Sequence, residues 1–419
     1  MYIHPVAPDG NGPMIIFENV DIFDGISPEI KENCHVAVEG KKIKEISRRR
    51  ISFSGGQRIC GKGKTLMPGL IDAHYHACLV KVEGYDLSTI PPSLLYPAAS
   101  RLLENTLRRG FTSVRDAGGA DFGLAEAVRQ GLVNGPEIFF SGRPITQTGG
   151  HGEIRPKHYE EPCLCSSHQA HMVVVADGAD QVRKAVREEF RKGAHQIKLM
   201  LNGGVSSEAD PVWLCQFTDD EIKAAVEEAN RRKSYVMAHL YQDKQIRKAV
   251  EMGIRTVEHG NFLQLETARL MAKSNVFLVP TLITYQALRD HGESYGFRDE
   301  NFQKLSEVMK ASLQSLENAM AANVKIGFGT DLLGAMHKFQ CGEFLIRREI
   351  QSPFEILKSA TSINGKILAP NGTLGIVAPN AQADMILING NPLQDLSLFN
   401  DRGDNIAFVM KKGNIVIQN

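Results

Sequence analysis

Four histidines, one lysine and one aspartate in this 419-residue chain have the types and spacing of ligands for a divalent metal. His74 and His76 are two residues apart, and side chains at i and i+2 of a strand point to the same side. Nitrogen and oxygen ligands without a thiolate favour Zn²⁺ or a similar metal. An open coordination position would let such a metal lower the pKa of a bound water toward about 7. The six candidate ligands are His74, His76, Lys198, His239, His259 and Asp331.

Each of these residues also has an ordinary structural interpretation. A single histidine near an apolar strand is usually a core or surface residue, and Asp331 alone could simply cap a helix. Lys198 is harder to explain in this way, because a lysine is almost never fully buried without a partner. The joint pattern favours a metal site, in which the carboxylate of Asp331 could bind the metal and take a proton from its water.

The candidate ligands lie at the ends of predicted strands. From about residue 67 to residue 374, short apolar runs alternate with helical patterns, which implies a parallel sheet. Eight strands predict a closed (β/α)8 barrel, whose active-site residues project from the C-terminal ends of its strands. An open doubly wound sheet is the alternative, but no G-x-G-x-x-G sequence follows the first strand. The predicted strands are 71–74, 111–115, 137–141, 196–201, 235–239, 256–259, 276–280 and 326–329.

Capping residues mark the start of two predicted helices between these strands. Thr218 and Glu221 have the spacing of a capping box, and Ser352 precedes a proline at the first helical position. The two ends of the chain look different, because short apolar or alternating runs separated by turn residues predict strands of small antiparallel sheets. These runs are 14–20, 35–39, 384–388, 406–411 and 414–417.

Composition restricts the function further. Lys plus Arg and Asp plus Glu both total 48, and this neutral balance argues against a partner that is a nucleic acid or a membrane. The chain has no apolar run of about 18 residues and no signal-peptide pattern. Seven scattered cysteines favour free thiols in a reducing cytoplasm. We therefore expect a cytoplasmic protein, which we also expect to be a homo-oligomer.

Four sequence elements, MPGLIDAHYH (67–76), the lysine of the fourth strand, the two later strand-end histidines and FGTD (328–331), carry a resemblance. The chain resembles the amidohydrolase superfamily over nearly its whole length. This resemblance implies that His74 and His76 bind the more buried of two zinc ions and that His239 and His259 bind the second. It also implies that Lys198 is carboxylated and bridges both metals, and that Asp331 ligates the first metal and shuttles the proton. Residues 1–65 and 375–419 would form one small β-sandwich beside a barrel of residues 66–374.

Within this superfamily the chain is most similar to the prolidase and carboxypeptidase-like branch, which cleaves dipeptides and N-acyl amino acids. The segments that carry this similarity are 110–119, 141–156, 195–211 and 328–340. The resemblance implies that metal-bound hydroxide attacks the amide of an Xaa-Pro dipeptide. Release of C-terminal Arg or Lys, and cleavage of an ochratoxin-type amide, are alternatives. Leu240 replaces the small Ala expected between His239 and Tyr241, and a bulky residue there could narrow the pocket.

Four residues are expected to contact substrate. The glycine-rich loop 148–152 lets the backbone approach a ligand closely, although a plain turn is the simpler interpretation. By resemblance, His151 of this loop and Tyr241 contact the substrate carboxylate or the scissile carbonyl. Arg155 could join them or pair with a surface acid, and His337 could line the pocket or lie in solvent.

Cys163 and Cys165 are interpreted as free thiols of a long loop, because Cys-x-Cys is shorter than the usual zinc spacing. Two other functions compete with peptide cleavage. Ring opening of a cyclic amide, as in imidazolonepropionase-like relatives, is one, but the fourth-strand lysine and the TGGHG loop favour the peptide branch. A scaffold without catalysis is the other, and it is disfavoured because all six ligand positions are filled.

Overall fold

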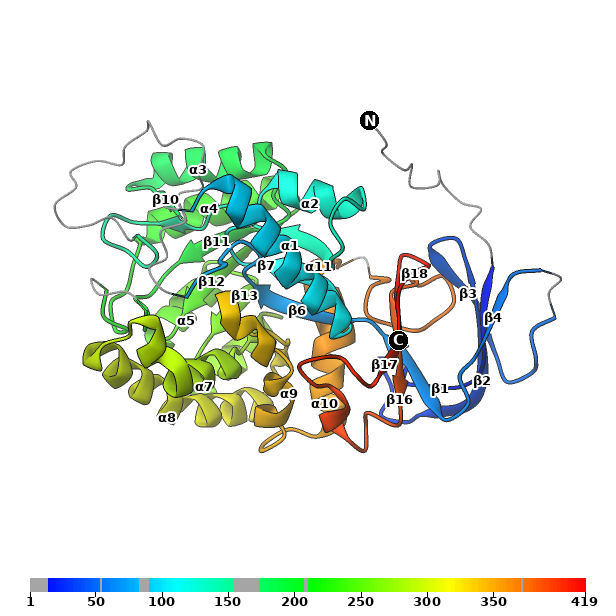
Figure 1. Cartoon of the computed structure of the whole chain (residues 1–419). Coiled ribbons are helices and arrows are strands. Elements are labelled where there is room, and N and C mark those ends of the chain that lie inside the picture. The colour runs from blue at the N-terminus through cyan, green and yellow to red at the C-terminus, as the bar shows by residue number, and fades with distance from the viewer. Residues whose placement is uncertain (1–13, 53–54, 83–89, 154–172, 207–209, 371) are drawn as a thin grey trace.

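In the computed structural model, the chain forms a barrel with a smaller sheet unit beside it (Figure 1). The structure describes residues 14–52, 55–82, 90–153, 173–206, 210–370 and 372–419. In this part of the chain, no helix is both long enough and apolar enough to cross a membrane.

The predicted (β/α)8 barrel is confirmed, with a strand at each of the eight predicted places. β15 is shorter than predicted, but the chain after it still completes the ring, because Ala73 donates a backbone hydrogen bond to Phe328 (2.8 Å) and Asp331 donates one to His74 (2.8 Å). The strands are β6 (Leu70–Tyr75), β7 (Phe111–Asp116), β8 (Glu137–Phe140), β11 (Ile197–Met200), β12 (Val236–Leu240), β13 (Thr256–His259), β14 (Phe277–Val279) and β15 (Lys325–Ile326).

Two further short strands, β9 (Ile145–Thr146) and β10 (Val174–Val175), were not predicted from the sequence. β9 pairs in parallel with β11 through Ile145 and Leu199. A backbone hydrogen bond connects β8 with the residues just before β11: the N–H of His195 donates to the carbonyl of Phe140 (2.8 Å). The sequence missed β9 and β10 because two-residue strands are too short to show a period.

Helices cover the outside of the barrel (Figure 1). Glu221 accepts a hydrogen bond from the backbone of Thr218 (2.6 Å), and Ser352 accepts one from the backbone of Glu355 (3.3 Å), so both predicted caps are present. The helices are α1 (Pro92–Arg108), α2 (Phe122–Arg129), α3 (Ala179–Arg191), α4 (Asp219–Arg231), α5 (Asp243–Glu251), α6 (Leu265–Lys273), α7 (Leu282–His291), α8 (Asp299–Ala321), α9 (Gly342–Arg347), α10 (Pro353–Lys358) and α11 (Asn364–Leu368).

Strands from both chain ends join in one eight-stranded sheet rather than in separate antiparallel sheets. Its order is β18-β17-β16-β5-β1-β2-β3, with β4 paired to β1, and β1 runs parallel to β4 and β5. The predicted boundary at residue 65 falls inside β5, so the division into two domains stays a prediction. The strands are β1 (Ile15–Ile22), β2 (Lys31–Glu39), β3 (Lys42–Ser47), β4 (Gln57–Cys60), β5 (Lys64–Pro68), β16 (Met385–Asn389), β17 (Ile406–Lys411) and β18 (Asn414–Gln418).

The sheet unit and the barrel share an apolar core. Phe111 and Phe328 of the barrel belong to the same buried cluster as Ile386 and Ile406 of the sheet unit. The strand β5 also runs directly into β6 through Gly69, where a Cβ atom would lie only 2.1 Å from the Thr112 hydroxyl. This junction holds the first ligand-bearing strand against the sheet unit.

Candidate active site

The predicted ligand side chains meet at one end of the barrel. Residues of one strand that are two apart share a face, so Lys198 points inward from β11 while its neighbours Ile197 and Leu199 pack against the helices. His259 and Asp331 have positive backbone φ angles of 69° and 52°. Non-glycine residues rarely adopt this conformation, and such positions cluster at functional sites.

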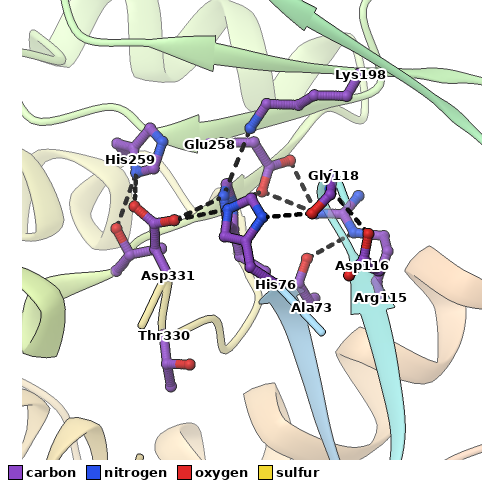
Figure 2. Close-up of polar contacts among 12 residues, drawn as sticks. Ala73, His76, Arg115, Asp116, Gly118, Lys198, Glu258, His259, Thr330 and Asp331 are labelled. Atoms are coloured by element: carbon purple, nitrogen blue, oxygen red, sulfur yellow. Dashed lines mark hydrogen bonds and ion pairs between the residues drawn. The ribbon is translucent and has the colours of Figure 1, made fainter. Parts of the chain in front are cut away.

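His74, His76 and Asp331 form the centre of the group. Figure 2 shows His76 and Asp331 facing each other there. Oδ1 of Asp331 lies 3.0 Å from Nε2 of His76 and 3.4 Å from Nε2 of His74. Nζ of Lys198 lies 3.5 Å from Nε2 of His74, and the ring of His259 is 4.8 Å from that of His74 between centroids. His239 completes the group, with its ring 4.6 Å from that of His259. The structure therefore brings all six predicted ligands together.

One ring nitrogen of each histidine contacts an oxygen outside the six candidate ligands. Nδ1 of His76 is 2.8 Å from the carbonyl of Gly118, and Nε2 of His239 is 3.2 Å from the carbonyl of Gly203. The other two outer contacts are Nδ1 of His259 with the Thr281 hydroxyl (2.8 Å) and Nδ1 of His74 with Glu258 (2.7 Å). Such outer contacts orient histidine ligands in metal sites, so this donor set fits a divalent metal.

The pKa shifts of the candidate ligands also favour metal binding. Burial lowers the pKa of His239 and of His259 well below the usual value, so both rings keep a free electron pair. Burial alone would raise the pKa of Asp331, but His74 and His76 lower it well below the usual value. Burial also lowers the pKa of Lys198 to about 8, which increases the share of neutral amine that could react with CO₂.

The ligand group lines a cavity of about 80 Å³ at this end of the barrel. One wall is apolar and contains Leu79, Leu288 and Leu333, which belong to a single buried cluster. Asp331 is the one acidic side chain among the lining residues that the structure describes. His151, Tyr241 and Tyr285 also line the cavity.

His151 and Tyr241, the two expected substrate contacts among the described residues, both line the cavity. Nδ1 of His151 is 2.9 Å from Asp210, and its ring stacks on that of His239 at 4.3 Å. The hydroxyl of Tyr241 lies 3.3 Å from that of Tyr285.

The expectation that Leu240 narrows the pocket is wrong. Leu240 lies between His239 and Tyr241 on one strand, so its side chain points to the opposite face. It packs in the buried core between the strands and the helices and does not line the cavity. The residue that differs from the resemblance therefore does not restrict substrate.

His337 lies behind the cavity and not on its wall, which corrects its predicted contact with substrate. It is 1% exposed in the short helix η4 (Gly334–Phe339), with Nε2 3.3 Å from the carbonyl of His76. Its ring lies 4.5 Å from that of Tyr75 in β6, a contact between distant segments that the sequence could not show. Arg155, Cys163 and Cys165 lie outside the described residues.

Glu258 and Arg115 are buried charged residues of the site that the sequence interpretation missed. Nη2 of Arg115 donates to both oxygens of Glu258 at 2.8 and 2.9 Å, and both side chains are fully buried (Figure 2). The reasoning that selected Lys198, a charge inside a buried strand, applies equally to these two residues and could have found them.

The amidohydrolase family model matches residues 65–416, most of the chain. The chain belongs to the amidohydrolase family. Among solved structures, a prolidase crystallised with N-methylphosphonate-L-proline shares 42% identity and a TM-score of 0.94, over 97% of this chain and 100% of that one. A Xaa-Pro dipeptidase with bound methionine shares 26% identity and a TM-score of 0.86, over 97% of this chain and 100% of that one.

A third relative is the ochratoxinase of Aspergillus niger, which is 31% identical over 360 residues, 80% of this chain and 72% of that protein. These relatives place the chain in the prolidase-like branch of the amidohydrolase family. It is a hydrolase that acts on amide or peptide bonds.

Proposed function

We propose that this amidohydrolase cleaves dipeptides or N-acyl amino acids that release a neutral, apolar amino acid, with Xaa-Pro dipeptides as the preferred substrates. The observation that carries this proposal is that one cavity is lined both by Asp331 with the histidine group and by the apolar side chains of Leu79, Leu288 and Leu333.

Two zinc ions or similar divalent metals would be held by the six ligand residues, of which Lys198 would bind in its carboxylated form. When bound, the metals would polarise the scissile carbonyl and make the attacking water more acidic. The donor set supports this assignment, because each histidine has one nitrogen fixed by an outer partner.

Asp331 is the proton carrier in this proposal. Its carboxylate is ionised and 24% exposed, so it can accept a proton from the attacking water at a carboxylate oxygen. It then gives that proton to the amide nitrogen of the leaving group. The leaving amino acid must therefore lie next to Asp331.

The wall beside Asp331 decides which amino acid can leave. Leu333 follows Asp331 by two residues, and Leu79 and Leu288 lie in the same apolar cluster. A proline ring or another apolar side chain would bury its surface there, at about 25 cal/mol per Å². The carboxylate of Asp331 is the one acid among the described lining residues and is occupied by histidines, so a cationic side chain would find no free acidic partner among those residues. Release of C-terminal Arg or Lys is thus disfavoured.

His151 and Tyr241 also line the cavity, where they would orient the scissile carbonyl or the free carboxylate of the substrate. The same arrangement accepts the N-acyl amino acids of the ochratoxin type, provided that the released residue is apolar. The similarity to a prolidase solved with a proline-containing phosphonate supports proline as the first released residue to test.

The test is a kcat/KM comparison across dipeptides that share one N-terminal residue and end in Pro, Phe, Lys or Arg, using zinc-loaded protein. We expect Leu-Pro and Leu-Phe to be cleaved at least about 100-fold better than Leu-Lys and Leu-Arg, because burial of an unpaired charge costs several kcal/mol.

A pair of matched variants checks the reason for this preference. Leu288→Asp places a carboxylate on the wall and should improve cleavage of Leu-Lys relative to Leu-Pro, whereas Leu288→Asn should not. Equal turnover of Leu-Lys and Leu-Pro by the unmodified enzyme would contradict the proposed specificity.

A further inference from the structure

Glu258 sits one position before the ligand His259 and points into the centre of the barrel from β13. The carboxylate has no exposed surface, and its oxygens contact His74, Arg115 and the Thr256 hydroxyl (2.5 Å). The Arg115 guanidinium donates to both oxygens of Glu258, at 2.8 and 2.9 Å, and this paired geometry holds the group as an ionised carboxylate.

The hydrogen atom shared by Glu258 and His74 must be bonded to the histidine. An ionised carboxylate only accepts hydrogen bonds, so Nδ1 of His74, 2.7 Å away, must carry the hydrogen. A neutral imidazole then has its electron pair on the other nitrogen. That nitrogen, Nε2, is the one that lies 3.4 Å from Asp331 and 3.5 Å from Lys198, at the centre of the ligand group.

His74 differs from the other three candidate ligand histidines in the chemical type of its outer partner, which is a carboxylate. The outer partners of His76 and His239 are backbone carbonyls, and that of His259 is a hydroxyl. A carboxylate behind a histidine increases the basicity of the ligand more than a neutral oxygen does. Arg115 keeps that carboxylate in place, because its Nε also donates to the carbonyl of Ala73, the residue before His74 (2.6 Å).

We propose that Glu258, held by Arg115, is a positioning residue that fixes His74 as a donor through Nε2. This makes the group of His74, His76 and Asp331 the tighter of the two metal positions. The inference rests on the proposed metal site and does not depend on which amide is cleaved.

The test measures Zn²⁺ binding directly, by competition between the metal-free full-length protein and a chromophoric chelator. Glu258→Gln keeps an oxygen that can accept from Nδ1 but removes the charge, so the tighter zinc step should weaken about tenfold. The double variant Glu258→Met/Arg115→Met removes the carboxylate and its counterion together, and the same step should weaken by up to about 100-fold.

The double variant also separates an effect on zinc binding from an effect on folding. Glu258→Gln leaves a buried guanidinium without its carboxylate, whereas replacing a whole buried ion pair by apolar residues is often neutral for stability. Urea unfolding of the zinc-free proteins shows which variants are folded. A residue with only a structural role would change that unfolding and leave the tighter zinc step of the folded protein unchanged.

Thr281→Val is the matched control, because it removes the neutral outer partner of His259 at nearly constant volume. It should weaken zinc binding less than Glu258→Gln does, and in the weaker step. An unchanged tighter step in the folded double variant, or an equal effect of Thr281→Val on that step, would overturn the inference. If the unmodified protein binds no Zn²⁺, the proposed metal site itself fails, which is a separate result.

Discussion

Asp331 combines the two properties that a proton carrier needs, an ionised carboxylate and access to the cavity. His74 and His76 keep it ionised, and its side chain is 24% exposed although both histidines are buried. Its positive φ of 52° turns the side chain back over the end of β6, whose backbone carbonyl at His74 accepts its N–H. The local backbone strain thus serves the placement of the carboxylate.

Asp331→Asn should lower kcat by about 10²–10⁴-fold, because an amide cannot accept and return the proton. Most of the bound zinc should remain, because the histidines and Lys198 are unchanged. Steady-state kinetics with Leu-Pro and metal analysis of the same sample measure both quantities. Asp290→Asn, on the exposed surface of α7, is the control and should keep full activity. Full activity of the Asp331 variant would refute the shuttle role.

At the scale of elements, α7 connects the floor of the cavity to its apolar wall. Thr281 at its start contacts the ligand His259, and Leu288 and Tyr285 along the helix face the cavity. The start of this helix is capped by Glu343 of α9, which accepts the N–H of Ile283 at 2.8 Å. Glu343 is fully buried, and burial outweighs the nearby Arg347 and raises its pKa to about 8.

This cap should make stability depend on pH. The unfolded chain loses the Glu343 proton near pH 4.5, whereas the folded protein keeps it up to about pH 8. Glu343 therefore makes its full contribution to the free energy of unfolding below pH 4.5. That contribution is lost between pH 4.5 and 8, by about 1.4 kcal/mol per pH unit. Urea unfolding of the unmodified protein and of Glu343→Gln from pH 5 to 8 should show that the variant lacks this decline.

Glu349→Gln is the control for this measurement, because Glu349 lies nearby but is exposed. Its pH dependence should follow that of the unmodified protein. A Glu343→Gln variant with the same decline between pH 5 and 8 would show that Glu343 is not the group responsible.

At the scale of the whole molecule, the sheet unit and the barrel share one apolar cluster and one continuous connection from β5 to β6. The ligand-bearing strand β6 begins at this junction, and β6 also closes the barrel against the segment that carries Asp331. Loss of the sheet unit would expose Phe111, Phe328 and their neighbours, so we expect the two units to unfold together.

Metal removal should therefore lower the stability of the entire chain. A metal present at 100 times its Kd stabilises the folded state by about 2.7 kcal/mol, so a strong chelator should lower the Tm by a few degrees in one transition. Differential scanning calorimetry measures this shift, and added Zn²⁺ should restore the Tm while Mg²⁺ should not. Two transitions, of which only one moves with metal, would contradict the shared core.

Local sequence patterns were enough to predict the barrel, the ends of its strands and the six candidate ligands. The period of two along a strand pairs His74 with His76, and parallel strands bring their C-terminal ends to the same edge. The same period would also have placed Leu240 on the outer face, since both of its neighbours were expected to face the pocket. The expectation that it narrows the pocket was wrong because it ignored that rule.

Other features depend on residues that are distant in the sequence. Arg115 and Glu258 are 143 positions apart and meet only because β7 and β13 both face the barrel interior. His337 follows Asp331 by six residues, yet it is buried against the ring of Tyr75 and the carbonyl of His76. The sequence by itself therefore determined which residues could bind metal and on which strands they lie, because strand periodicity is local. Only the tertiary structure decided which charges support those ligands and which side chains reach the cavity, because barrel closure sets those contacts.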